Sequence, residues 1–178
     1  EGHWDKLFLQ GSYTWARSTG NTEGGIKSDI GQGDTGTTQD FDYRELMLGT
    51  DGPLPNDRKH TLKVFGNYEL NDQWSIGGNL LVQSGRPINC FGVYGNDPVH
   101  YGASYFSCSN TPGTDADGDG VLDNGTQVVP RGSAGRTPWQ RQLDLNVAWK
   151  PAFADGRLTF KLDVFNVFNS RTVTSVVE

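Results

Sequence analysis

The residues with the clearest chemical potential form an acidic stretch, Asp-Ala-Asp-Gly-Asp-Gly-Val-Leu-Asp, at positions 115–123. Carboxylates packed this closely repel one another unless a hard cation neutralises them. Their spacing matches the oxygen ligands of a calcium-binding loop, with Gly120 at the sharp turn. The predicted ligands are the side chains of Asp115, Asp117, Asp119 and Asp123 and the carbonyl oxygen of Val121.

The end of this stretch departs from a complete calcium loop. Thr126 stands where an EF-hand has a bidentate glutamate, so one strong ligand is missing. The stretch resembles thrombospondin type 3 and dockerin-like repeats more than a full EF-hand, which implies a weak structural site suited to extracellular calcium. The alternative is a solvated acidic loop tip, because Asp- and Gly-rich stretches often form turns.

Cys90 and Cys108, the only cysteines, lie on one long predicted loop. An even number of cysteines in an oxidising compartment predicts a disulfide. The alternative is two free, buried thiols. No catalytic residues are predicted, because His3, His60 and His100 are far apart in the sequence and no nucleophile-elbow glycine pattern is present.

The elements that carry these loops are five segments in which apolar and polar side chains alternate. Such a period of two predicts β-strands with two different faces. In residues 74–83, for example, Trp74, Ile76 and Leu80 alternate with Ser75 and Asn79. The predicted strands are residues 6–17, 61–70, 74–83, 141–149 and 157–168.

The connections between these segments alternate in length. Residues 71–73 and 150–156 are short links, whereas residues 18–60 and 84–140 are long. Long loops are uncommon in compact soluble domains, but transmembrane barrels combine short periplasmic turns with long extracellular loops. The pattern favours an antiparallel up-and-down barrel segment with extracellular loops at 18–60 and 84–140. The beginning of the first loop, residues 20–40, is expected not to pack a core because it is rich in Gly, Thr and Asp.

Aromatic residues mark both ends of the predicted strands, as expected at the two interfaces of a bilayer. Those near the short turns are Tyr68, Trp74, Trp149 and Phe153, and those at the opposite ends are Trp15, Trp139 and Phe168. No apolar run approaches the length of a transmembrane helix. A formal net charge of −6 with no basic cluster argues against a nucleic-acid partner.

Five strands cannot close a barrel, and an open sheet edge is not stable in lipid. The chain is therefore expected to be part of a larger barrel. If the short turns are periplasmic, the fifth strand runs outward, and one more inward strand would bring the C-terminus to the periplasm. The strand direction therefore predicts that the chain contains the last strands of a barrel except the final one.

Several stretches resemble the C-terminal barrel region of TonB-dependent outer-membrane receptors, closest to the Oar-like group. They cover nearly the whole chain, and the Asn-Val-Phe-Asn sequence at 166–169 is similar to a motif that precedes the last strand in these receptors. The stretches are residues 12–24, 56–70, 75–108, 129–149 and 158–169. An energy-coupling box, a plug domain and a terminal aromatic strand are not found in this sequence.

The resemblance implies a barrel of about 22 strands around a plug, in the bacterial outer membrane, that takes up a scarce solute with energy from the inner membrane. The implied partners are outer-membrane lipid, the rest of the barrel and its plug, the TonB complex and an unknown solute. Two alternatives are a secreted calcium-dependent β-sandwich that binds surfaces and a passive porin-like barrel. The receptor barrel differs from the sandwich in that its apolar faces meet lipid rather than form a shared dry core. It differs from the porin only in having a plug.

Overall fold

The computed structural model describes residues 1–95, 97–108 and 128–176. The predicted calcium ligands lie outside the described residues. The chain divides into two compact units, each described by itself. The sheet unit comprises Glu1–Ala16, Arg58–Gly85 and Pro138–Thr172, and the loop unit comprises Arg17–Asp57, Arg86–Thr137 and Val173–Glu178.

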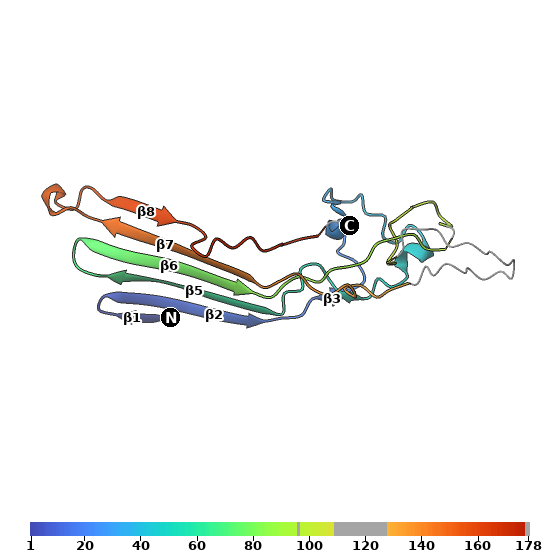
Figure 1. Ribbon diagram of the computed structural model, residues 1–178, viewed down its shortest axis with the longest axis horizontal. Coiled ribbons are helices and arrows are strands. Elements are labelled where there is room, and N and C mark those ends of the chain that lie inside the picture. The colour runs from blue at the N-terminus through green and yellow to red at the C-terminus, as the bar shows by residue number, and fades with distance from the viewer. Residues whose placement is uncertain (96, 109–127, 177–178) are drawn as a thin grey trace. The chain divides into compact units, whose positions relative to one another are not determined.

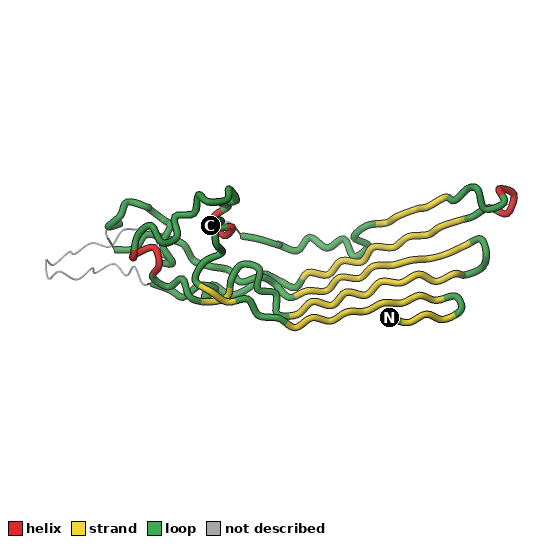
Figure 2. The backbone as a smooth tube through the Cα atoms, turned by 180° about the vertical axis from the view of Figure 1, so that it is seen from behind, coloured by secondary structure: helices red, strands yellow, loops and turns green. Residues whose placement is uncertain are grey.

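The sheet unit is one antiparallel sheet of six strands in the order β1-β2-β5-β6-β7-β8 (Figures 1 and 2). Neighbours in the sheet are therefore also consecutive along the chain, apart from the two short strands that belong to the loop unit. This is the up-and-down arrangement that the alternating segments predict. The strands are β1 Gly2–Trp4, β2 Leu7–Trp15, β5 His60–Glu69, β6 Trp74–Gln83, β7 Gln140–Trp149 and β8 Phe160–Val164.

The first edge of the sheet contains a strand that the alternating pattern did not predict. β1 folds back on β2, with His3 opposite Phe8 and Trp4 opposite Leu7. Three residues are too few to display a period of two, so the pattern carries no signal for this strand.

The last strand is shorter than the predicted segment 157–168. Val164 pairs with Leu145, but the N–H of Val167 then donates to the carbonyl oxygen of Leu143 at 2.8 Å, one residue out of register. Asn166 has a φ of 52° and donates its N–H to Asp144 Oδ1 at 2.8 Å. A residue in left-handed conformation forms a β-bulge here, which ends the regular ladder.

Turn chemistry explains the short connections. Asn71 Oδ1 accepts hydrogen bonds from the N–H groups of Gln73 and Trp74, both at 2.9 Å, and so closes the β5–β6 turn. Between β7 and β8 the chain forms the 3₁₀ turn η3, Ala152–Ala154, followed by Asp155 and Gly156 at positive φ. Among the described residues, no helix is long and apolar enough to cross a membrane.

The loop unit contains short elements around a small core. They are β3 Thr19–Gly20 paired with β4 Gly52–Pro53, η1 Ser28–Ile30 and η2 Arg44–Met47. Leu46, Phe91, Val93, Tyr105 and Phe106 are buried. The expectation that residues 20–40 do not pack a core is wrong: Lys27, Asp29 and Asp40 of this segment are buried as well.

Candidate functional site

One face of the sheet is a continuous apolar surface with many exposed large side chains. The strand register places apolar side chains in rows, for example Val64, Leu80 and Leu143 across β5, β6 and β7. Exposed fractions on this face reach 66% at Leu162. Its exposed large side chains are Leu9, Tyr13, Trp15, Leu62, Tyr68, Trp74, Ile76, Leu145, Phe160, Leu162 and Val164.

An exposed apolar surface of this extent marks a site of contact with lipid or protein. Because side chains alternate along a strand, shifting the register by one residue would exchange the two faces completely. The ten-residue strands are the length that spans a bilayer when tilted. The sheet therefore has the geometry of a membrane wall.

The opposite face is mainly polar. Asn79 is opposite Asp144, and Lys63 is opposite Ser12, so charged and amide side chains form continuous rows. Phe8 and Phe65 are exceptions, with ring centroids 5.8 Å apart. The other polar-face residues include Gln10, Thr14, Asn67, Glu69, Gln142, Asn146, Lys161 and Asp163. Such a face is suited to a hydrated barrel interior.

Aromatic rings form a belt at the short-turn end of the apolar face. Trp149 stacks on Trp74 with centroids 5.7 Å apart and on Phe160 at 5.5 Å. Phe153 approaches the edge of Trp149 at 6.5 Å. The amphipathic indole rings of Trp74 and Trp149 prefer the headgroup level of a bilayer.

A second belt lies at the other strand ends and includes a residue that the sequence did not single out. His60 stacks on Tyr13 and on Trp139, with centroids 6.2 and 5.8 Å apart, and Tyr13 Oη lies 2.7 Å from His60 Nδ1. His60 is directly opposite Trp15. The alternating pattern could have placed His60 on the apolar face, because it lies two residues before Leu62. The ring stacking could not be predicted, because it depends on which residues of the neighbouring strands lie opposite His60.

The Asn-Val-Phe-Asn motif forms a turn after β8. Asn166 and Asn169 both have positive φ, and asparagine tolerates this conformation better than most residues. The Asn166 side chain exchanges hydrogen bonds with the backbone of Ser170, at 2.9 and 3.1 Å. The motif therefore has a structural role at the end of the wall.

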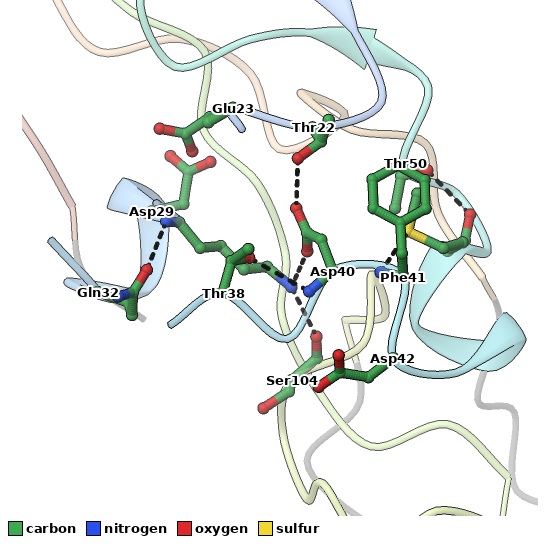
Figure 3. Close-up of polar contacts among 12 residues, drawn as sticks. Thr22, Glu23, Asp29, Gln32, Thr38, Asp40, Phe41, Asp42, Thr50 and Ser104 are labelled. Carbon is green, nitrogen blue, oxygen red and sulfur yellow. Dashed lines mark hydrogen bonds and ion pairs between the residues drawn. The ribbon is translucent and has the colours of Figure 1, made fainter. Parts of the chain in front are cut away.

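The loop unit is organised around buried charges. Lys27 Nζ lies 3.2 Å from Asp40 Oδ1, and both side chains are 1% exposed. The same ammonium lies 5.4 and 5.5 Å from the ring centroids of Phe91 and Phe106, which stabilises it by cation–π attraction. Asp40 also accepts a hydrogen bond from Thr22, and Ser104 lies nearby (Figure 3).

A second buried carboxylate, Asp29, joins both long loops. Asp29 accepts hydrogen bonds from Arg86 at 2.9 Å and Asn89 at 2.6 Å, and Arg131 Nη1 lies 3.7 Å away. Burial, followed by repulsion from Glu23, raises the pKa of Asp29 even though the two arginines lower it. Arg131 reaches the other loop by donating to the carbonyl oxygen of Thr50 at 2.7 Å.

Cys90 and Cys108 form a disulfide with Cα atoms 4.8 Å apart. The bond joins the segments that carry Phe91 and Phe106, whose ring centroids are 4.8 Å apart. It therefore holds the two rings that flank Lys27. Among the residues that the structure describes, no group of three or more His, Cys, Asp or Glu side chains could hold a metal ion.

Asp97 closes a tight turn in the second loop. Its carboxylate accepts hydrogen bonds from Tyr105 Oη at 2.7 Å and from the N–H groups of Tyr101 and Gly102 at 2.9 and 3.0 Å. The bond from Tyr105 is the main reason that the pKa of Asp97 is lowered. Burial raises the pKa of Tyr105 to about 12, and the hydrogen bond to Asp97 is the second cause of this increase.

This turn is expected to open in acid. Because the fold lowers the pKa of Asp97, its contribution to stability is present above the unfolded value of 3.8 and disappears as the pH falls through the lowered pKa. Pepsin cleavage at Tyr101 and Tyr105, normalised to an unfolded reference peptide, should increase across this range. Asp97→Asn should remove the pH dependence, and an unchanged profile in that variant would contradict the assignment.

The two faces and the aromatic belts define a class of protein, a membrane-spanning β-barrel wall. The chain belongs to the outer membrane beta barrel domain family, whose model matches residues 3–175, and it is a protein of the bacterial outer membrane. It is similar to the TonB-dependent transporter Oar of Myxococcus xanthus, with 34% identity over 177 residues. That match covers 97% of this chain and 14% of the relative's length. No solved structure matches the chain.

Proposed function

We propose that this chain forms the C-terminal barrel wall and two external loops of an energy-coupled outer-membrane transporter for a scarce solute. The observation that carries the proposal is the similarity to a TonB-dependent transporter along nearly the whole chain. The lipid-facing and polar faces of the sheet give each surface a role in such a barrel. In this proposal the plug and the closing strand come from other parts of a longer protein.

The proposal assigns partners to each surface. Outer-membrane lipid covers the apolar face, and the remainder of the barrel continues the sheet at its edges. The plug faces the polar side, and the TonB complex acts through parts of the protein outside this chain. The chain itself performs no bond-making step and has no nucleic-acid partner. A secreted β-sandwich is disfavoured because the apolar face is exposed, with Leu162 at 66%.

A passive porin-like barrel is the remaining alternative, and energy dependence separates it from the proposal. Solutes that cells remove from the medium can be identified by mass spectrometry in three strains: wild type, a strain without the full-length protein, and a strain without the inner-membrane coupling complex. The proposal expects at least one solute that both deletion strains leave in the medium. If every solute that depends on the protein is still removed without the coupling complex, the barrel is passive.

We also propose that Asp115, Asp117, Asp119, Asp123 and the Val121 carbonyl bind calcium in the second loop. With the glutamate position occupied by Thr126, affinity in the range of about 0.1–1 mM is expected. Titration calorimetry of the full-length protein with Ca²⁺ measures it. Asp117→Asn combined with Asp119→Asn should weaken binding at least about tenfold, because each substitution replaces a charged carboxylate ligand by a neutral amide oxygen. Equal affinity in this variant would indicate a solvated acidic loop.

A further inference from the structure

Two partly exposed aromatic side chains, Tyr43 and Tyr101, form an aromatic patch on the loop unit, and Phe41 lies two residues before Tyr43 in the chain. Phe41 is 63% exposed and Tyr43 47%. Tyr101, from the second loop, meets Tyr43 from the first edge-on, with centroids 5.7 Å apart. Its hydroxyl donates to Asp42 Oδ2 at 3.2 Å. The patch therefore combines ring surfaces with a solvent-accessible carboxylate.

The backbone holds Phe41 in a conformation that its side chain does not favour. Its φ is 68°, in the left-handed region that bulky residues rarely occupy. The N–H of Phe41 donates to Met47 Sδ at 3.3 Å, which helps to keep this geometry. Burial does not compensate for the strain, since the ring is largely exposed. Strain of this kind is often retained at ligand sites.

The backbone around Tyr101, in the second loop, is also constrained. The Asp97 carboxylate accepts the Tyr101 N–H, and both Asp97 and His100 have positive φ. The position of Tyr101 therefore depends on a closed turn anchored to the buried Tyr105. Because both loops supply rings from constrained segments, little ordering is required when a ligand binds.

The charge of the loop unit indicates what the patch attracts. The residues of this unit that the structure describes include nine acidic and six basic ones, a formal charge of −3, whereas the sheet unit has a charge of +2. Lys27 and Arg131 are buried, but so are Asp29, Asp40 and Asp57, which leaves six acidic and four basic residues of the described set outside the interior. Arg44, which is exposed next to Tyr43, is formally balanced by Glu45. The field at the patch therefore favours positively charged ligands.

We propose that the aromatic patch binds an ammonium or guanidinium group. The ring faces attract the cation through their quadrupoles, and Asp42 pairs with its charge. The group can belong to a small organic cation or to a basic side chain of a peptide. This inference rests on the proposal that the loop unit faces the outside of the cell, where it would meet such a ligand first.

The test is calorimetric titration of the full-length protein in lipid nanodiscs with choline, the neutral tert-butyl isostere of choline, and a lysine tripeptide. At least one of the two cations should bind, and choline, if it binds, should exceed its neutral isostere by about tenfold. Tighter binding of the tripeptide identifies a peptide as the source, and tighter binding of choline identifies a small cation. Binding of neither cation, or equal binding of choline and its isostere, would overturn the proposal.

Two variants locate the site. Asp42→Asn keeps an acceptor for the Tyr101 hydroxyl but removes the charge, and Tyr43→Leu removes a ring. Each should weaken cation binding about five- to tenfold. Phe153→Ala is the matched control, because it removes an 80% exposed ring from the sheet unit and should leave binding unchanged. Undiminished affinity in Asp42→Asn would rule out the patch even if Tyr43→Leu does not fold.

Binding in nanodiscs needs no energy source, so this test is independent of the transport proposal. Cation binding that depends on Asp42, together with solute removal that does not require the coupling complex, would retain the patch and reject energy coupling. Energy-coupled solute removal without cation binding would reject the patch alone.

Discussion

Leu80→Arg is expected to destabilise the folded protein in a bilayer by about 2–4 kcal/mol. Leu80 lies near the middle of β6 on the apolar face, between Val64 and Leu143. An arginine there would have to remain charged among lipid chains or distort the sheet to reach the interface. Denaturant unfolding of the full-length protein in lipid vesicles measures the loss.

The neighbouring residue provides the control. Asn79 is adjacent to Leu80 in sequence but lies on the polar face, opposite Asp144. Asn79→Arg should change the free energy of unfolding by less than about 0.5 kcal/mol, since the new charge lies in a polar environment beside a carboxylate. Equal losses in the two variants would show that the apolar face does not meet lipid or that the polar face does not line the interior.

Lys27→Ala is expected to cost the loop unit about 3–5 kcal/mol of local stability, because it leaves the Asp40 carboxylate buried without its counter-charge. It also removes the cation that lies over Phe91 and Phe106. Hydrogen exchange of peptides that contain Phe91 and Phe106, followed by mass spectrometry, measures the local free energy of opening. Peptides from the sheet strands should be unaffected.

A double variant separates lost charge balance from lost packing. Lys27→Met with Asp40→Leu replaces the ion pair by apolar side chains and should recover more than half of the loss. Arg44→Ala, which removes an exposed cation of the same unit, should have an effect below about 0.5 kcal/mol. A double variant as unstable as Lys27→Ala would show that the unpaired carboxylate is not the cause.

Together these experiments examine the two parts of the proposed transporter separately. The wall depends on which side chains meet lipid, whereas the loop unit depends on a network of buried ions and a disulfide. The aromatic patch is presented by the loop unit, so its ligand affinity should be sensitive to Lys27→Ala. Its affinity should be insensitive to Asn79→Arg, which changes only the wall.

The sequence by itself determined the wall. Four strands begin and end within two residues of the predicted segments: β2, β5, β6 and β7. The reason is that alternation over about ten residues predicts a strand and places all of its apolar side chains on one face of the sheet. The alternation of short and long connections also indicated the order of the strands. Both signals are local in the chain, so neither needed information about distant contacts.

The tertiary structure alone decided the edges of the sheet and the interior of the loops. β1 is too short to show a period, and the bulge at Asn166 depends on the side chain of Asp144 from the neighbouring strand. Lys27 and Asp40 look like solvated loop charges in the sequence. They become buried because Phe91 and Phe106, more than fifty residues away in the chain, enclose the ammonium that pairs with the carboxylate. Such burial arises from long-range packing, and no local pattern encodes it.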